Sequence, residues 1–327
     1  MKFLFLLFIP FLIFSQTIYV SSEGSDQSGD GSLTNPFLTI QYAIDNGASE
    51  ILLLEGVYSR SETINGSNII IKPNDDSNVV YDGTITINQS ETSSLNWIQH
   101  NENVYKTALN KDIWQLFIDN NEMIMARWPN STFENNLIYD NDTWAHSSSD
   151  DADGIVNDIT DISILYEESK NLNDFTNEDI SGAMLIANFG SFKTKVKTVL
   201  ETGLDIENSK FEYTPIGGEY RDKHHYYFLE GKLAFLDHPN EWFYDDGFLY
   251  LWSESGDGSD LVNLNIKGKV QDFAFIISDC SNITIEGIKF FGTTISIQNS
   301  SDIEIHNNIF SYPNYSKRML GDTLSPL

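Results

Sequence analysis

The sequence predicts an all-β protein: a parallel β-helix that carries an inserted β-rich domain and a short helix at its N-terminal end. Between residues 273 and 310, apolar and polar side chains alternate and the pattern recurs with a shift of twenty residues. Alternation is typical of strands with one buried face, and a fixed period of this size indicates stacked coils. All 6 tryptophans lie between residues 91 and 265, where the repeat is lost, which indicates an insertion of different character.

Residues 1–15 are predicted to be a signal peptide. Lys2 supplies a positive charge, and residues 3–14 form an apolar run that is too short for a comfortable membrane span. Cleavage after Ser15 would leave a mature chain with no membrane-inserted segment. We therefore expect the protein to be secreted or otherwise extracytoplasmic, in a periplasm or at a cell surface.

Residues 16–90 are predicted to hold the N-terminal cap and the first coils. Residues 36–46 are expected to form the capping helix, because Pro36 would occupy its first turn and Gly47 would follow its end. The continuous apolar run at 51–54 favours a buried parallel strand. Such a helix would cover the unpaired strand edges at the open end of the coils. Its apolar face would be formed by Phe37, Ile40 and Ile44.

Residues 91–265 are assigned to the inserted β-rich domain. Asp246 and Gly247 separate two aromatic runs, which is a strong signal for a β-hairpin over residues 242–250. Residues 183–187 and 192–199 have the composition of further strands. The polar, acidic stretch 135–179 is expected to form long loops.

Residues 266–327 are predicted to return to the coils. Shifting residues 273–310 by twenty places apolar residues on apolar residues, as stacked strands require. The aligned pairs are Ser281 with Ser301, Ile283 with Ile303, Ile285 with Ile305, Phe290 with Phe310, Phe275 with Ile295 and Ile277 with Ile297.

Glu286, Glu304 and His306 are the candidate catalytic residues. If the isoleucines of these strands point inward, all three side chains point outward, and the repeat places Glu286 beside His306. Glycosidases need two carboxyl groups flanking the bond that they cleave, about 5 to 9.5 Å apart. The alternative is that these residues form a solvated polar face.

Two further groups of residues are candidates for binding. Arg127 beside Trp128 could hold a substrate between a guanidinium and a stacking ring, or Arg127 could instead pair with an acidic side chain. Calcium binds six to eight oxygen ligands, so an acidic segment is a candidate site for structural calcium, or else a solvated loop. No cofactor is otherwise expected. The acidic candidates are Asp150, Asp151 and Asp153.

The charge balance narrows the classes of partner. The chain has 19 basic and 48 acidic residues, a formal net charge of −29, whereas nucleic-acid binding needs basic patches. Nucleic acid is therefore not expected as a partner. Cys280 is the only cysteine, so no internal disulfide can form, and we expect it to be a small core residue.

Four segments together resemble exported right-handed parallel β-helix proteins, the pectin lyase-like class. They are the opening Ile18–Phe37, the segment Leu53–Tyr58, the run Met125–Asn130 and the aromatic stretch Tyr227–Tyr250. The last two resemble the inserted β domain of β-helix glycoside hydrolases of the β-xylosidase and fucosidase/xylanase type. The resemblance implies a carbohydrate-active protein with a carbohydrate partner, and most directly a glycoside hydrolase.

Two alternatives to the hydrolase stay open, because lyases and adhesins share the opening motif and the repeats. One is a polysaccharide lyase, which the charge of −29 disfavours since a lyase groove for an anionic polymer would be basic. The other is a non-catalytic surface or adhesion module. In the resembling enzymes the catalytic carboxylates lie in coils after the insertion, and few coils follow it here. We therefore expect a truncated chain, and the resemblance assigns no catalytic residue.

Overall fold

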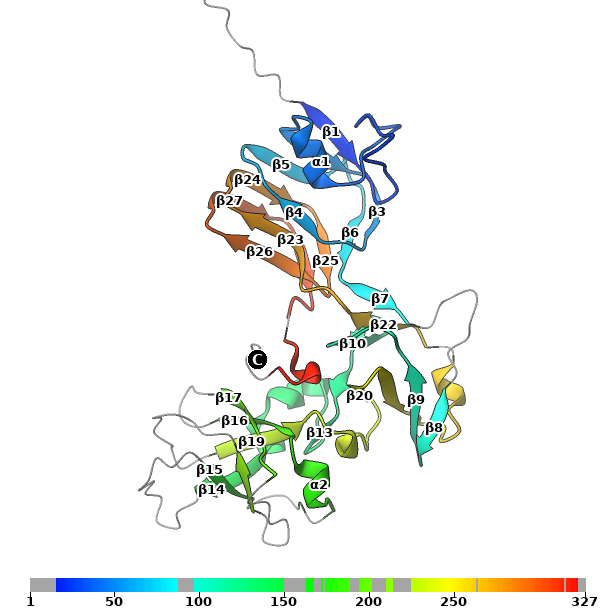
Figure 1. Cartoon of the computed structure of the whole chain (residues 1–327), viewed down its shortest axis with the longest axis vertical. Coiled ribbons are helices and arrows are strands. Elements are labelled where there is room, and N and C mark those ends of the chain that lie inside the picture. Colours follow the sequence, from blue (N-terminus) through cyan, green and yellow to red (C-terminus); the bar gives the residue numbers. More distant parts are fainter. Residues whose placement is uncertain are drawn as a thin grey trace, which may run out of the picture. The chain divides into compact units, whose positions relative to one another are not determined.

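The computed structural model describes residues 16–87, 97–149, 163–167, 172, 174–188, 194–201, 210–213, 225–262, 264–314 and 316–322. The predicted signal peptide lies outside these residues. The chain divides into two compact units (Figure 1). The first comprises Met1–Thr84 and Gln271–Asn314, and the second comprises Ile85–Val270 and Tyr315–Leu327.

The first unit contains three sheets in which every strand pairs in parallel with its neighbours. One sheet has, in spatial order, β1 (Thr17–Val20), β2 (Glu50–Leu53), β5 (Ile69–Pro73), β24 (Ser281–Glu286) and β27 (Ser301–His306). The second has β28 (Ile309–Ser311), β25 (Lys289–Phe291), β6 (Val79–Asp82) and β3 (Gly56–Tyr58). The third has β26 (Thr294–Gln298), β23 (Phe273–Ser278) and β4 (Glu62–Ile64).

The twenty-residue register predicted from the sequence is confirmed. Ile283 pairs with Ile303 and Ile285 with Ile305, and the same shift relates β23 to β26 and β25 to β28 in the other two sheets. Ile283 and Ile285 are fully buried, so the predicted inward direction is also correct for them. The outward side chains of β24 and β27 therefore share one face of the five-stranded sheet.

The N-terminal helix α1 spans Ile40–Asp45 and is shorter than the predicted 36–46. Its N-cap is Thr39, whose side-chain oxygen accepts a hydrogen bond from the Tyr42 N–H at 3.2 Å. Phe37 instead forms a parallel bridge with Val20, which holds the preceding residues extended and delays the start of the helix. The helix packs against β1 and β4 and buries Ile40 and Ala43.

The second unit is built largely from antiparallel pairs. One sheet has β11 (Asn121–Glu122), β10 (Leu116–Ile118), β22 (Ile266–Lys269) and β7 (Thr84–Thr86). Another has β12 (Ile124–Met125), β20 (Glu241–Asp245), β21 (Phe248–Trp252), β9 (Val104–Ala108) and β8 (Ile98–Asn101). The largest has β17 (Thr194–Thr198), β16 (Met184–Asn188), β19 (His225–Glu230), β14 (Ala145–Ser149), β15 (Ser163–Glu167) and β18 (Lys210–Tyr213), with β13 (Arg127–Trp128) also on β19.

Helices are short in the part of the second unit that the structure describes. They are η1 (Glu134–Tyr139), η2 (Asn141–Thr143), α2 (Asn177–Ile180), η4 (Leu233–Phe235), η5 (Ser259–Leu261) and η6 (Arg318–Leu320). In neither unit do the described residues form a helix with the length and hydrophobicity that spanning a membrane would require.

The predicted hairpin and strands of the second unit are confirmed. Phe243 pairs with Tyr250 across the hairpin, and its turn residues Asp246 and Gly247 have φ values of 44° and 76°, as the Asp-Gly signal predicts. β16 and β17 match the two predicted strands closely. The expectation of long loops over 135–179 is wrong in part, because β14 and β15 lie there and pair with each other and with β19 and β18. This polar stretch forms strands because it pairs with β19 and β18, which lie far away in the sequence.

The predicted right-handed parallel β-helix is wrong as the fold class of this chain. The sheets mix parallel and antiparallel pairs: β9, β20 and β21 are antiparallel neighbours, whereas β12 pairs with β20 in parallel. The chain is mostly β with few helices, and its mixed sheets point to a β-sandwich-like fold instead of a β-helix solenoid. The repeat that suggested the solenoid covers only residues 273–310 and reports the pairing of neighbouring strands, not the architecture of the chain.

Candidate functional site

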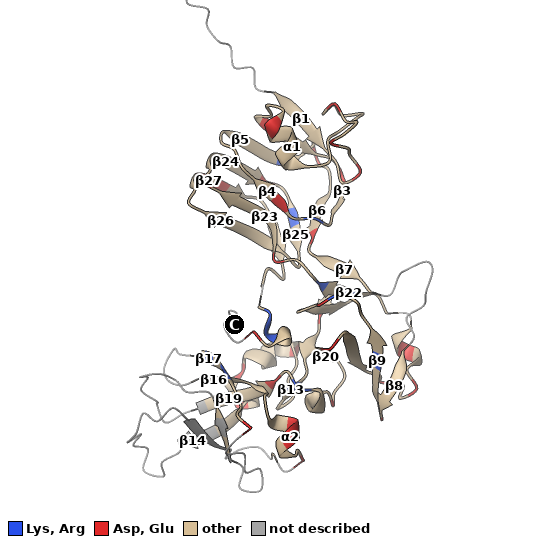
Figure 2. Ribbon diagram, viewed as in Figure 1, with Lys and Arg blue, Asp and Glu red and all other residues tan. Residues whose placement is uncertain are grey.

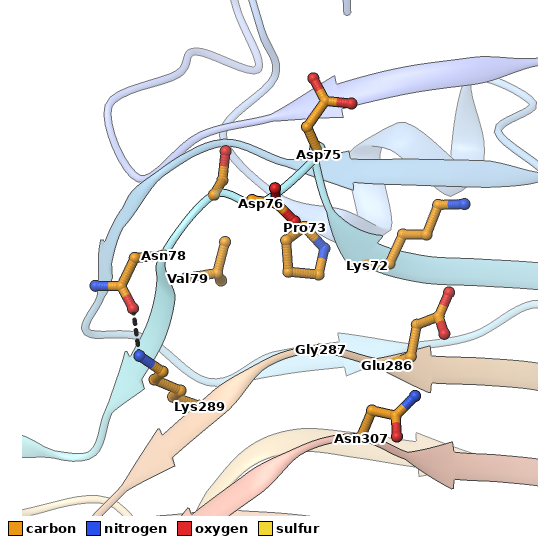
Figure 3. Close-up of a pocket in the computed structure, with 11 residues that line it drawn as sticks. Lys72, Pro73, Asp75, Asp76, Asn78, Val79, Glu286, Gly287, Lys289 and Asn307 are labelled. Carbon is orange, nitrogen blue, oxygen red and sulfur yellow. Dashed lines mark hydrogen bonds between the residues drawn. The ribbon is translucent and has the colours of Figure 1, made fainter.

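A cavity of about 430 Å³ opens in the first unit where β5 and β24 end and the chain turns toward β6 and β25 (Figure 3). The loop between β5 and β6 covers residues 74–78, whereas only Gly287 and Ile288 connect β24 to β25. The longer loop therefore forms a wall beside the tight turn. The polar residues that line the cavity are Lys72, Asp75, Asp76, Ser77, Asn78, Glu286, Lys289 and Asn307.

The tight turns at this corner depend on residues that tolerate a positive φ. Gly287 has a φ of 73° and Asn307 a φ of 58°, in the left-handed region that glycine and asparagine adopt most readily. A Cβ on Gly287 would lie 3.1 Å from Cδ of Pro73, so the turn is also close-packed. These turns end β24 and β27 abruptly and leave Glu286, the last residue of β24, and Asn307, directly after β27, at the rim of the cavity.

Glu286 and His306 are brought together, as the sequence predicts. They are register partners on β24 and β27, and Glu286 Oε2 lies 3.5 Å from His306 Nδ1. The two side chains are 32% and 45% exposed, so both are open to a ligand from solution. Figure 3 shows Lys72 on β5, Glu286 at the end of β24 and Asn307 directly after β27 at this rim.

Glu304 lies on the same face, two residues before His306, and pairs with Thr284. A strand spacing of about 4.8 Å and a rise of about 3.3 Å per residue place its Cα roughly 8 Å from that of Glu286. Long glutamate side chains at this backbone separation can bring two carboxyl groups to either side of one glycosidic bond. The exposed Ile70, on the neighbouring β5, pairs with Thr284 and adds apolar surface in this row.

Two lysines at the cavity have fixed partners. Lys72 Nζ lies 2.8 Å from Glu50 Oε1, and this hydrogen bond raises the pKa of Lys72 and lowers the pKa of Glu50. Lys289 Nζ donates to Asn78 Oδ1 at 2.8 Å. The cavity thus presents ammonium donors beside carboxylate acceptors, an arrangement that suits a ligand rich in hydroxyl groups.

Sequence reasoning missed the residues that the loop 74–78 contributes. The twenty-residue repeat relates β24 to β27, but nothing in it shows that β5 pairs with β24 across more than two hundred residues. The available signal was the run Asn74 to Asn78, in which polar, turn-forming residues follow an apolar strand and end at Val79.

Arg127 and Trp128 lie in the second unit and are buried, with 2% and 9% of their surface exposed. The guanidinium of Arg127 lies 3.8 Å from the ring centroid of Phe228, and Nε donates to the Pro129 carbonyl at 3.0 Å. Trp128 packs edge-on against Phe175. Both side chains therefore lie in the interior of the second unit, where protein groups cover them.

Glu230 and Glu241 lie near Arg127, but neither forms an ion pair with it among the described residues and its Nη2 has no hydrogen-bond partner, so the pairing that the alternative expects is not formed. Burial lowers the pKa of Arg127 to about 10, and the nearby carboxyl groups of Glu230 and Glu241 partly oppose this shift. Burial raises the pKa of Glu241 to about 9, and neither carboxyl oxygen has a hydrogen-bond partner of normal geometry. Glu230 in turn pairs with Arg318, at 2.5 Å between Oε1 and Nε.

The calcium candidates Asp150, Asp151 and Asp153 lie outside the described residues, so that expectation stays a prediction. Within the described ranges, no group of three or more histidine, cysteine, aspartate or glutamate side chains is arranged to hold a metal ion. Cys280 is buried, as expected, and its thiol donates to the Ser278 carbonyl at 3.0 Å. Figure 2 shows acidic positions spread over both units.

Comparison with known proteins gives a likeness of fold. No protein-family model matches this sequence, and no curated protein matches it. A solved structure titled "Glycoside hydrolase" is similar, with a TM-score of 0.59 and 15% identity over 85% of this chain and 51% of that chain. A second, titled "The complex structure of XylC with xylose", has a TM-score of 0.35 and 15% identity over 85% of this chain and 36% of that chain.

The first comparison shows a likeness of fold alone, and the second is too distant in structure to add to it. The chain spans about half the length of the glycoside hydrolase structure that it matches.

Proposed function

We propose that this chain is an exported, carbohydrate-active protein of the glycoside hydrolase type, and that Glu286 and Glu304 are its pair of acidic groups. The observation that carries the proposal is the position of Glu286 at the rim of the 430 Å³ cavity, with Glu304 on the next strand of the same face. The likeness to a structure titled "Glycoside hydrolase" supports it at the level of fold.

The pair would act as two carboxyl groups with complementary roles. One, in its acid form, gives a proton to the glycosidic oxygen as the bond from that oxygen to the anomeric carbon breaks. The other, ionised, either attacks the anomeric carbon or takes a proton from the water that does so. His306 lies against Glu286 and would hold that carboxylate in one orientation.

The surroundings favour an uncharged oligosaccharide or polysaccharide, with xylan-, fucose- and galactose-type substrates as the first to test. Lys289 and Asn78 present hydrogen-bonding groups on the wall of the cavity. The exposed Ile70 offers apolar surface in the row that holds Glu304, against which the C–H face of a sugar ring can pack. With Asp75, Asp76 and Glu286 against two lysines, the cavity does not have the basic lining that an anionic polymer would favour.

The test is an assay of residues 16–327 on aryl glycosides and oligosaccharides, with binding followed separately by calorimetry. Glu286→Gln and Glu304→Gln should each lower kcat about a thousandfold if they act in the chemical step. Glu55→Gln, at an exposed turn between β2 and β3, is the matched control and should leave kcat unchanged.

Full activity in either glutamine variant would refute the assignment of that carboxylate. Specific oligosaccharide binding without turnover, in this chain and in any longer product of its gene, would favour the non-catalytic binding module.

A further inference from the structure

Acidic and basic side chains alternate across the outward face of the five-stranded sheet in the first unit. They come from the successive strands β2, β5, β24 and β27. In spatial order they are Glu50, Lys72, Glu286 and His306. Basic side chains therefore flank Glu286 on both neighbouring strands, and a nearby cation favours the ionised form of a carboxyl group.

Lys72 is held in place from the side of β2. Its Nζ lies 2.8 Å from Glu50 Oε1, and the second oxygen of Glu50 accepts a hydrogen bond from the Thr17 hydroxyl at 2.8 Å. Both oxygens of Glu50 thus have partners. This carboxylate therefore fixes the ammonium group of Lys72 over the sheet.

On the side of β24, Lys72 neighbours Glu286. The two residues directly follow the paired residues Ile285 and Ile71, so they lie next to each other on the outward face. The hydrogen bond to Glu50 is the largest cause of the raised pKa of Lys72, and the charge of Glu286 adds to it. An electrostatic interaction acts on both partners, so Lys72 in turn stabilises the charged form of Glu286.

The other charged groups that line the cavity are placed less closely around Glu286. Asp75 and Asp76 lie on the loop between β5 and β6, not on a neighbouring strand. Figure 3 shows the carboxylate of Asp75 directed away from Glu286. Lys289 lies on β25 and donates its hydrogen bond to that loop. Lys72 and His306 are therefore the two basic groups that act on Glu286 from adjacent strands.

Glu304 has different strand neighbours among the described residues. It pairs with the uncharged Thr284, whose own partner on β5 is the apolar Ile70. His306 lies two residues further along β27, but its Nδ1 is 3.5 Å from Glu286 Oε2. The surroundings thus favour the ionised form at Glu286 more than at Glu304.

We propose that Lys72 is a positioning residue that holds Glu286 as the ionised member of the pair, while Glu304 supplies the proton. The assignment rests on the proposed function and fixes the two roles that the pair could otherwise exchange. Glu286 would attack the anomeric carbon, or take a proton from the water that does so. Glu304 would give its proton to the glycosidic oxygen as the bond from that oxygen to the anomeric carbon breaks.

The first test is the pH dependence of kcat/KM for residues 16–327 with Lys72→Met, which removes the charge and keeps an unbranched side chain. Without the ammonium group, the acidic limb of the profile should move to higher pH by about half a unit, because ionising Glu286 becomes harder. The basic limb reports the general acid and should stay in place. A purely structural role for Lys72 would move neither limb.

Two further variants and a change of salt control this test. Lys72→Arg keeps the charge and should keep the wild-type profile. Lys111→Met, at an exposed position in the second unit, should leave both kcat and the profile unchanged. The side chains of Lys72 and Glu286 are 33% and 32% exposed, so the shift caused by Lys72→Met should shrink at about 1 M salt.

The second test separates the two roles by the leaving group. Glu304→Gln should lose at least about tenfold less kcat/KM on a dinitrophenyl glycoside than on an oligosaccharide, because dinitrophenolate departs without a proton. Glu286→Gln should lose a similar factor on both substrates, since its role does not depend on the leaving group. Circular dichroism and the melting temperature check that each variant folds.

The outcomes distinguish this assignment from the proposed function. An unchanged profile in Lys72→Met, a shift of the basic limb alone, or the reverse dependence on the leaving group would overturn the assignment and leave the pair standing. Full activity in both glutamine variants, or a chain without turnover on any of these substrates, would overturn the pair and the assignment together.

Discussion

Phe290 and Phe310 stack face to face, with ring centroids 4.6 Å apart and planes within 6° of each other. They are the last two rings of a series inside the first unit. Tyr58 stacks on Tyr81 at 4.9 Å and Tyr81 on Phe290 at 5.9 Å. One aromatic residue from each of the successive strands β3, β6, β25 and β28 thus contributes to a continuous column, in which only the final ring is substantially exposed.

This column predicts unequal costs for two similar substitutions. Phe290→Ala should lower the free energy of unfolding by about 3–5 kcal/mol, because a buried ring leaves a cavity between two neighbours. Phe310→Ala should cost about 1 kcal/mol, since its ring is 38% exposed and has one stacking partner. Denaturant unfolding followed by circular dichroism measures both. Equal losses would show that the column does not end at Phe310.

Arg318 should stabilise the second unit through Glu230. The carboxylate of Glu230 is buried with 5% of its side chain exposed, so Arg318→Ala leaves that charge without its closest partner. Removing one partner of such a pair costs about 3–5 kcal/mol, and we expect a loss near the lower figure because Arg127 also lies close. Lys111→Ala, at an exposed position, is the control in a thermal-melt comparison. An unchanged melting temperature for Arg318→Ala would contradict the pairing.

Glu241 should make stability fall as pH rises. Its folded pKa of about 9 lies well above the ordinary value of 4.5, so the folded state holds a proton that the unfolded state has released. Between pH 4.5 and pH 9, each rise of one pH unit should therefore lower the free energy of unfolding by up to about 1.4 kcal/mol through Glu241.

Glu241→Gln, which resembles the protonated acid, should therefore raise the melting temperature at pH 8 and leave it nearly unchanged at pH 4. Melting curves of the variant and the wild type from pH 4 to pH 8 measure this difference in melting temperature. Identical pH profiles for the two proteins would show that Glu241 is ionised in the folded state.

The sequence predicts local features of this protein well. The register of β24 on β27 follows from the alternation of isoleucines and a constant shift of twenty residues, and the hairpin follows from Asp246 and Gly247. Each depends on residues that are close together in the chain. The position of Glu286 beside His306 could be predicted for the same reason.

The parts that were not predicted depend on pairing between distant segments. The repeat at 273–310 does not reveal that β9, β20 and β21 form an antiparallel sheet, so the fold class was wrong. Nor does it show that the loop 74–78 lies against β24, which is what creates the cavity. The burial of Arg127 was hidden as well, because a charged residue beside a tryptophan looks the same in sequence whether it faces a ligand or a core.

The most direct test of the central proposal is a double-mutant comparison at Glu286 and Glu304. The kcat/KM of residues 16–327 on an aryl glycoside is measured under identical conditions for the wild type, Glu286→Gln, Glu304→Gln and the double variant. Two carboxyl groups that act as one unit should show strong non-additivity, so the double variant should lose little more activity than either single variant. Losses that multiply, or wild-type activity that survives in the double variant, would contradict the proposal that these residues form the catalytic pair.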